Sequence, residues 1–210
     1  IVTVEDPIEY LYVDKKALVD QREIGIDAVN FAEALRALLR EDPDVVLIGE
    51  MRDRETFEAA LRAAETGHQV FGTVHASTAP GTISRALDLF PPEGRPLVRR
   101  SLAMNLKAII CQRLLPSIRK NVTRVPAVEV LLTNSSVQKL IEEGRDDELA
   151  DVIRSHETYG MQGLTRSLME LIEKDYIDPK VAYEVAPNVE ELKMYMKGIS
   201  PSHSGLVTRR

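Results

Sequence analysis

Carboxylates and imidazoles gather in three short stretches of this sequence. TVEDPIEY at residues 3–10 has three carboxylates within five residues. DPDVVLIGEMRD at residues 42–53 has four aliphatic residues that lead to Glu50. GHQVFGTVHAS at residues 67–77 places His68 before an apolar run and His75 directly after it. Acids and imidazoles grouped in this way are the side chains of general acid–base and phosphoryl-transfer chemistry.

Phosphoryl transfer is the reaction that these groups fit best. It needs cations on the phosphate, a carboxylate that orients the attacking water, and hydrogen-bond donors at the terminal phosphate. We expect Glu50 to orient the water and His75 to donate to the terminal phosphate, since imidazole titrates near neutral pH. Glu9 or Asp6 would hold magnesium, directly or through its water shell, because Mg²⁺ prefers carboxylate and water oxygens.

Each stretch alone also has a purely structural explanation. A glutamate after an apolar strand can be a solvated loop residue, and a lone histidine at a strand end is more often a structural hydrogen-bonding group. An acidic stretch before a proline is commonly a turn. Metal capture by His68 and His75 is disfavoured, since no further ligands surround them in sequence. The arrival of all three stretches in order, each at a strand end, favours the functional interpretation.

The elements predicted around these stretches alternate between strand and helix. Asn30 followed by Glu33 predicts a capped helix that runs through Arg40. Strands are predicted at 2–4, 45–48, 70–74 and 127–132, and further helices at 55–65, 82–89 and 95–110. The apolar runs at 45–48 and 70–74 suit strands buried on both faces of a parallel sheet. In such an open α/β sheet, ligands bind at the carboxyl ends of the strands.

Length and composition exclude several classes of protein. The 210 residues are 44% hydrophobic and 29% charged, which is typical of a globular chain rather than a disordered one. Every apolar run is shorter than the ~20 residues of a membrane span. A single cysteine, Cys111, excludes an internal disulfide and a cysteine-cluster zinc site, which indicates a cytoplasmic protein. Because the chain begins with Ile1 rather than Met, we expect it to continue a segment upstream.

The net charge of −6 is unevenly distributed. Residues 95–124 carry eight Lys and Arg and no acid. Nucleic-acid binding is one explanation, but this block has no aromatic residue on which a base would stack. A contact between oppositely charged surfaces of neighbouring subunits explains the same block, so we expect no nucleic-acid partner.

The character of the chain changes after residue 133. Apolar residues recur there at helical spacing, so residues 134–198 are predicted to form a small helical subdomain. Residues 1–133 would form the α/β domain. Residues 199–210 are predicted to be a disordered tail or a remnant of the expression vector.

Taken together, the three stretches resemble the Asp box, Walker B and His box of the secretion-type ATPases that drive type II secretion and type IV pili. The resemblance runs from residue 1 to about residue 198 and includes SVQKLIEE at 136–143 and YGMQGL at 159–164. Assembly-type relatives usually insert a four-cysteine zinc module after residues equivalent to 112–114, and this sequence has none. The sequence therefore resembles the type IV pilus retraction ATPases of the PilT and PilU type.

Two departures accompany the resemblance. Gln138 stands where the helical signature usually has a basic residue, and residues 101–109 are closer to the PilU type of accessory retraction ATPase. In addition, Gly49 stands where many P-loop enzymes carry a magnesium-binding Asp.

The resemblance implies an α/β fold with a RecA-like P-loop ATPase core, incomplete in these residues, followed by a small helical subdomain. It implies that Glu50 is the catalytic glutamate, that Glu9 is the Asp-box carboxylate that holds Mg²⁺, and that His75 senses the phosphate. His68 would support His75, and Asp6 would lie near the nucleotide.

For the whole protein, the resemblance implies an ATP- and Mg²⁺-dependent homo-hexamer that powers pilus retraction and twitching motility. Its implied partners are an inner-membrane pilus platform protein and a related retraction ATPase. Such a protein would be cytoplasmic and peripheral at the inner membrane through the pilus machinery.

A phosphate-binding loop of the form Gly-x-x-x-x-Gly-Lys-[Ser/Thr] does not occur in the 210 residues. In the resembled family this loop lies upstream of the Asp box. We therefore expect these residues alone neither to bind ATP tightly nor to hydrolyse it. Three alternatives stay open: a type II secretion or pilus-assembly ATPase of the same superfamily, a non-catalytic ring-forming or interaction module, and a DNA-translocating motor.

Overall fold

A computed structural model describes residues 1–197, and their contacts divide the chain into two compact units. The first unit combines Ile1–Ala76, Pro80–Lys107 and Thr133–Leu149. The second combines Ser77–Ala79, Ala108–Leu132 and, among the described residues, 150–197. Within residues 1–197, no helix is long and apolar enough to cross a membrane.

These units do not follow the boundary predicted at residue 133. Thr133–Leu149 groups with the first unit, whereas Ala108–Leu132 groups with the second. The assignment of residues 1–133 to an ATPase core and of residues 134–198 to a helical subdomain stays a prediction. The predicted tail at 199–210 lies outside the described residues.

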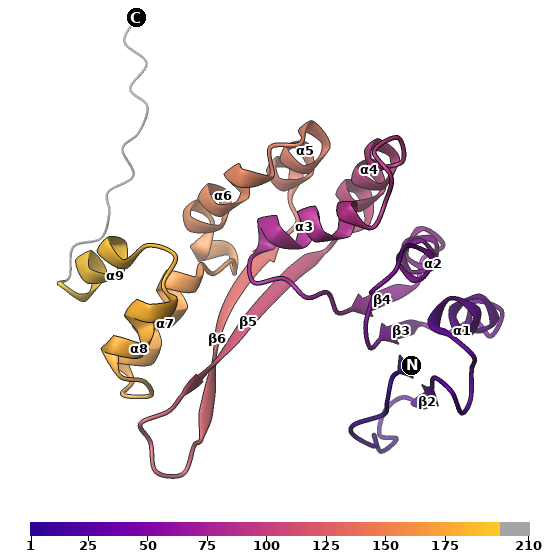
Figure 1. The fold of residues 1–210 in the computed structure, drawn as a ribbon, viewed down its shortest axis with the longest axis horizontal. Coiled ribbons are helices and arrows are strands. Elements are labelled where there is room, and N and C mark those ends of the chain that lie inside the picture. The colour runs from indigo at the N-terminus through magenta and orange to yellow at the C-terminus, as the bar shows by residue number, and fades with distance from the viewer. Residues whose placement is uncertain (198–210) are drawn as a thin grey trace, which may run out of the picture. The chain divides into compact units, whose positions relative to one another are not determined.

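The first unit is built on a parallel sheet of four strands in the order β2-β1-β3-β4 (Figure 1). The parallel α/β architecture and the strands predicted near residues 2–4 and 45–48 are confirmed. β2 was not predicted, because its sequence DQRE is polar and shows no hydrophobic pattern. The strands are β1 (Val2–Glu5), β2 (Asp20–Glu23), β3 (Val45–Ile48) and β4 (Gln69–Gly72).

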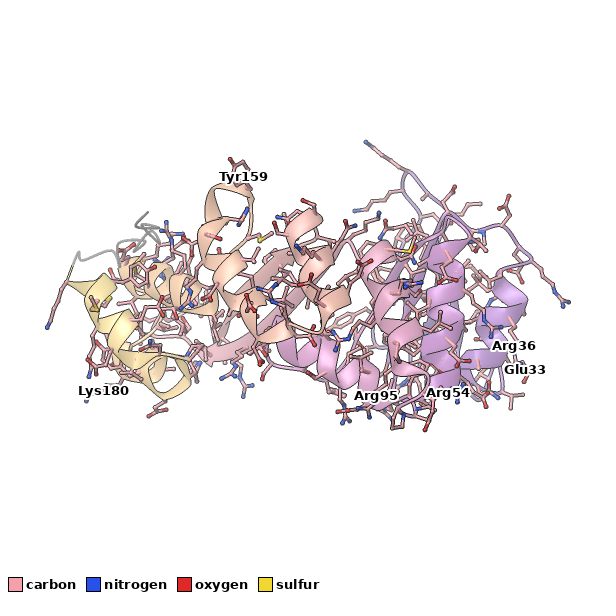
Figure 2. The ribbon with its side chains drawn as sticks, turned by 90° about the horizontal axis from the view of Figure 1, so that it is seen from above. Glu33, Arg36, Arg54, Arg95, Tyr159 and Lys180 are labelled. Atoms are coloured by element: carbon pink, nitrogen blue, oxygen red, sulfur yellow. The ribbon has the colours of Figure 1, made fainter. Side chains whose placement is uncertain are left out.

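Helices α1 (Phe31–Leu38) and α2 (Arg54–Glu65) pack with this sheet through apolar side chains. The predicted Asn30 cap is confirmed, because its side chain accepts the N–H of Glu33 at 2.8 Å. Glu33 lies on the exposed side of α1 (Figure 2). The buried residues of this core are Val2, Val4, Ala34, Leu35, Leu38, Val46, Ile48, Ala59 and Ala60.

Three further helices complete the first unit. The helix predicted at 82–89 forms as α3 (Ala79–Asp88), which begins at the boundary between the units. α4 (Arg95–Asn105) packs with α5 (Ser135–Glu143), which is capped by Asn134 and followed by a 3₁₀ turn at Asp146–Glu148.

The strand predicted at 70–74 forms as β4, but it is not buried on both faces. Phe71, in its centre, is 55% exposed. β4 pairs with β3 along one side, and no other strand in residues 1–197 pairs with its outer edge. The prediction of burial on both faces is wrong because, in the described part of the chain, Val70 packs against the core on one face while Phe71 on the other face stays exposed.

The prediction of a helix over residues 95–110 is wrong at its carboxyl end. α4 stops at Asn105, and β5 (Ala108–Pro116) follows, paired antiparallel with β6 (Arg124–Leu132). β6 contains the strand predicted at 127–132. The residues of β5 alternate between buried and exposed, as a strand requires, but the preceding apolar residues continue a helical spacing into it. The sequence pattern is ambiguous there, and cross-strand pairing selects the strand.

The β5–β6 hairpin carries the core of the second unit. Residues 160–163 lie along β6, where Gln162 and Val130 exchange backbone hydrogen bonds of 2.8 and 3.0 Å. Glu129 on β6 is buried, accepts the N–H of Ala79 at 2.7 Å, and has its pKa raised by that burial. The helical character predicted beyond residue 134 is confirmed by α5 and by α6 (Leu149–Ser155), α7 (Leu164–Glu173), α8 (Pro179–Val185) and α9 (Val189–Met196).

Part of the basic block at 95–124 is neutralised within each unit. Arg99 in the first unit forms a two-pronged pair with Asp146, at 2.7 and 2.9 Å. Arg119 in the second unit lies 3.8 Å from the ring centroid of Tyr176 and donates to carbonyls at the end of α7. These contacts use two of the eight cations without any external partner.

Candidate active site

The three predicted stretches meet at the carboxyl edge of the parallel sheet in the first unit. β1 leads into Asp6, β3 leads into Glu50, and β4 leads through residues 73 and 74 to His75. Val4 of β1 is aligned with Ile48 of β3, which is aligned in turn with the last residue of β4. Residues that follow aligned parallel strands share one edge of the sheet, where α/β proteins bind ligands.

Hydrogen bonds beyond the end of β3 hold the backbone on both sides of Glu50. The Gly49 N–H donates to the carbonyl of Val4 at 2.7 Å, and the Met51 N–H donates to the carbonyl of Thr73 at 3.0 Å. The Thr73 hydroxyl donates to the carbonyl of Gly49. Glu50 therefore leaves the sheet from a fixed point between β1 and β4.

Gly49 lies too close to β1 to carry a side chain without a shift of backbone. A Cβ there would lie 3.1 Å from the carbonyl oxygen of Val4 and 3.2 Å from the Cα of Glu5. The close approach of β1 therefore accounts for a glycine at this position.

The carboxylate of Glu50 is engaged on both oxygens. Its Oε1 lies 2.8 Å from Nε2 of His75, and its Oε2 lies 2.5 Å from the guanidinium of Arg52. The Glu50 side chain is 18% exposed. Arg52 chiefly, against some loss of hydration and with help from His75, holds the pKa of Glu50 below its ordinary value. Glu50 is thus a charged hydrogen-bond acceptor at neutral pH.

A hollow of about 210 Å³ opens beside this carboxylate. Its polar lining consists of Glu50, Arg52, His75 and Arg85, the last contributed by α3. Two guanidinium groups and an imidazole around one carboxylate give the hollow a positive balance. Arginine binds phosphate and carboxylate oxygens well, so this lining suits an anionic ligand.

Of the acids in the first stretch, Asp6 acts on this group through its charge. Its negative charge acts on Arg52 and helps to raise the pKa of that guanidinium, after the larger effect of Glu50. Glu5, by contrast, accepts hydrogen bonds from the Thr3 hydroxyl at 2.6 Å and the Gln21 amide at 3.0 Å. Through its Oε1, Glu5 therefore joins β1 to β2.

Glu9 is exposed on that same loop, and in residues 1–197 it forms no ion pair with the other site residues. The described residues contain no group of three or more His, Cys, Asp or Glu arranged to hold a metal ion. Mg²⁺ commonly binds one or two carboxylates together with substrate phosphates and water. Single carboxylates at this edge fit binding of Mg²⁺ together with phosphates and water. The role of Glu9 in such binding stays a prediction.

His68 is not brought to the same place. It precedes β4 whereas His75 follows it, so the two imidazoles lie at opposite edges of the sheet. The Nδ1 of His68 lies 3.0 Å from the carbonyl of Ala63 and 3.1 Å from the hydroxyl of Thr66, at the end of α2. The prediction that His68 supports the phosphate site gains nothing from this placement.

Arg52 and Arg85 are the site residues that sequence reasoning missed. Arg52 had a usable signal, because it stands two residues after Glu50 and arginine suits phosphate recognition. Arg85 had only its place on the helix after His75, and the packing of α3 alone brings it to the hollow.

The first unit has a parallel α/β sheet with acids and an imidazole at its carboxyl edge. This arrangement defines the class of α/β proteins with a ligand site at that edge, and comparison with known proteins points to the same class. The chain belongs to the family of type II/IV secretion system proteins, whose family model matches residues 1–175. Both the predicted family and the predicted fold class are thereby confirmed.

Particular relatives within this family are similar over most of the chain. A twitching motility protein of Neisseria gonorrhoeae is 43% identical over 192 residues, which are 91% of this chain and 51% of the relative. The type IV pilus retraction ATPase PilT of Pseudomonas aeruginosa is 44% identical over 186 residues, 89% of this chain and 54% of that protein.

Solved structures agree with these relatives. The crystal structure of the pilus retraction motor PilT with bound ADP matches with a TM-score of 0.82 and 46% identity, over 92% of this chain and 54% of that one. The chain therefore spans about half the length of the curated relatives it matches.

Proposed function

We propose that these residues form the catalytic edge of an ATP-hydrolysing motor subunit that powers type IV pilus retraction. The observation that carries the proposal is the contact of Glu50 with His75 at 2.8 Å, beside a hollow that Arg52 and Arg85 also line. The names of the relatives that match about nine-tenths of the chain, a twitching motility protein and a retraction ATPase, support the direction of the motor.

Each side chain at the hollow takes a part in the proposed reaction. The charged carboxylate of Glu50 accepts a hydrogen bond from the attacking water and turns the oxygen of that water toward the terminal phosphate. His75 is 81% exposed and held through Glu50, so it can donate to a phosphate oxygen and lose that bond when phosphate leaves. Arg85 adds positive charge where the transition state is most negative.

Magnesium, when bound with ATP, neutralises phosphate charge. We propose Glu9 and Asp6 as the carboxylates that would hold it or its water shell. The cradle for the phosphates themselves needs backbone amides and a lysine that this sequence does not offer. We therefore assign that cradle to a segment outside these 210 residues, in a longer protein similar in length to the relatives.

For that longer protein we propose a homo-hexamer, with an inner-membrane pilus platform protein and a related retraction ATPase as partners. Its place would be the cytoplasmic side of the inner membrane. The support is the family membership and the naming of the relatives.

Replacement of Glu50 by Gln in the longer protein tests the catalytic role. Gln keeps the shape of the side chain but loses the charge that orients the water. We expect kcat for ATP to fall by about 10²–10⁴-fold, with nucleotide affinity changed by no more than a few fold. Phosphate release measures the first and titration with a fluorescent nucleotide measures the second.

Glu93→Gln is the matched control, because Glu93 is an exposed acid before α4, away from the hollow. Turnover in Glu50→Gln equal to that of Glu93→Gln would eliminate the catalytic role. The non-catalytic ring-forming alternative makes a different prediction: the unsubstituted longer protein would bind nucleotide and release no phosphate.

A further inference from the structure

The backbone and the carboxylate of Glu50 are held by different groups. Bonds on both sides of Glu50 tie its backbone to β1 and to the segment after β4. Beyond the Cα, a glutamate side chain has three rotatable bonds, and the side chain of Glu50 is 18% exposed. Its orientation depends on two contacts, Arg52 on Oε2 and His75 on Oε1.

Arg52 is well placed to serve as the more constant of these two contacts. On one side of it, the Met51 N–H is bonded to the carbonyl of Thr73. On the other side, Asp53 caps α2, with its carboxylate accepting the N–H of Thr56 at 2.8 Å and the hydroxyl of Thr56 at 2.9 Å. The backbone of Arg52 is therefore fixed between a strand end and a helix start.

The charge of Arg52 is also permanent, because a guanidinium stays protonated in proteins. Arg52 binds Glu50 at 2.5 Å and lies within the field of Asp6, so it links the ends of β1 and β3. A carboxylate oxygen has two acceptor positions, so an oxygen held by Arg52 or by His75 still has one position for a water molecule. Two fixed partners limit the directions in which those positions point.

We propose that Arg52 is a positioning residue for Glu50: its guanidinium holds Oε2 so that the carboxylate, with His75 on Oε1, keeps one orientation toward the attacking water. This inference rests on the proposed ATP hydrolysis. A catalytic carboxylate needs such supporting contacts, because small errors of position are costly in rate.

If Arg52 only stabilised the folded state, its loss would lower the free energy of unfolding. The guanidinium of Arg52 is 68% exposed, and ion pairs of exposed side chains contribute little to the free energy of unfolding. Loss of Arg52 should therefore leave the folded state intact, and its effect on Glu50 can be measured in a folded protein.

The first experiment needs no ATP hydrolysis. Carbon-13 NMR of the glutamate carboxyl groups, with Glu50 assigned, follows its titration in this chain and in Arg52→Ala, Arg52→Lys and Arg62→Ala. The charged groups around Glu50 are Arg52, His75 and Arg85, with Asp6 beyond Arg52.

We expect the pKa of Glu50 to rise in Arg52→Ala, to rise less in Arg52→Lys, and to stay unchanged in Arg62→Ala. Arg62 is the control because its side chain is 72% exposed on α2 and 3.9 Å from Glu58, outside the hollow. Equal pKa values for Glu50 in Arg52→Ala and in the unsubstituted chain would overturn the inference.

The second experiment measures steady-state ATP hydrolysis by the longer protein with the same three substitutions. In Arg52→Ala we expect kcat to fall by about 10–100-fold with KM nearly constant, and partial recovery in Arg52→Lys. Since Glu50 must be charged to orient water, a higher pKa moves the acid limb of the pH–rate profile to higher pH.

A rise in KM with unchanged kcat would instead make Arg52 a nucleotide-binding residue and would overturn the positioning role. If the unsubstituted longer protein hydrolyses no ATP, the proposed function fails, while the titration of Glu50 still reports whether Arg52 holds its carboxylate. The two failures are therefore distinguishable.

Discussion

At the scale of single residues, the end of β3 depends on the absence of a side chain at Gly49 as well as on the carboxylate of Glu50. The close approach of β1 leaves no room for a Cβ at Gly49, and the same approach supplies the bond from Gly49 to Val4 that fixes Glu50. A side chain at position 49 would require backbone atoms of β1 to shift, and the carboxylate at this edge stands on the next residue, Glu50.

Gly49→Ala should therefore destabilise the first unit. The new methyl group meets backbone atoms on β1, which cannot rotate away as a side chain can. We expect a loss of about 1–3 kcal/mol in the free energy of unfolding, measured by urea denaturation followed by circular dichroism.

Gly94→Ala is the control for this substitution. A Cβ at Gly94 has its nearest neighbour at 3.5 Å, which is an ordinary contact distance. We expect a clearly smaller loss there. Equal losses at the two glycines would mean that β1 and β3 adjust easily and that Gly49 is not sterically required.

Residue types and order were enough to place Glu50 and His75 at one edge of the sheet. The acid follows one apolar run and the imidazole follows the next, and neighbouring parallel strands bring such positions together. Arg85 could not be predicted in this way, because its approach depends on how α3 packs. His68 shows the converse, since a suitable residue type at the wrong end of β4 ends up beside α2.

At the scale of elements, Arg99 shows why a basic block in the sequence need not be a basic surface. From α4 it reaches both carboxylate oxygens of Asp146 and the carbonyl of Ile141 at 2.8 Å. The pair is only partly exposed, at 20% for Arg99 and 12% for Asp146. One side chain thereby joins α4 to the end of α5 and the turn that follows.

Arg99→Ala should cost about 1–3 kcal/mol in the unfolding of the first unit, because it leaves Asp146 and the helix end without their donor. Arg99→Lys should recover only part, since an ammonium cannot make the two-pronged contact. Thermal unfolding measures both variants.

Arg100→Ala is the matched control, because the neighbouring Arg100 is exposed on the same helix. We expect it to leave the midpoint of unfolding nearly unchanged. Equal shifts for Arg99→Ala and Arg100→Ala would show that lost helix propensity or net charge, rather than the Asp146 pair, is responsible.

The elements also differ in how far the sequence could specify them. The runs of β1 and β3 and the cap of α1 are local signals, and they predict these elements well. β2 has no apolar pattern, because it is held by pairing with β1. β5 was mistaken for the end of a helix, because only its pairing with β6 decides between two spacings that the apolar residues both satisfy.

At the scale of the whole molecule, the chain belongs to its family over residues 1–175 but spans only about half the length of its relatives. The water-orienting acid and the phosphate-sensing imidazole that we propose belong to the first unit, and the sequence holds no phosphate-binding loop. Residues that only orient the water and the terminal phosphate cannot catalyse hydrolysis when no other segment holds the phosphates of ATP.

The 210 residues by themselves should therefore show no Mg²⁺-dependent ATP hydrolysis above background and only weak ATP binding. Phosphate release and isothermal titration calorimetry measure the two quantities, with the longer protein as the positive control. Turnover by the 210 residues that Glu50→Gln abolishes would contradict the assignment of the phosphate cradle to another segment.

The order of residues by itself determined the parallel α/β class, the edge at which the acids and the imidazole gather, and the family. These properties follow from local patterns, because strand polarity sends the residues after each strand to one side of the sheet. Tertiary structure alone decided that Arg85 lines the hollow, that His68 lies beside the end of α2, and that Thr133–Leu149 joins the first unit. Those outcomes depend on contacts between segments that are distant in the sequence. The spacing of residues along the chain does not predict the distances across such contacts.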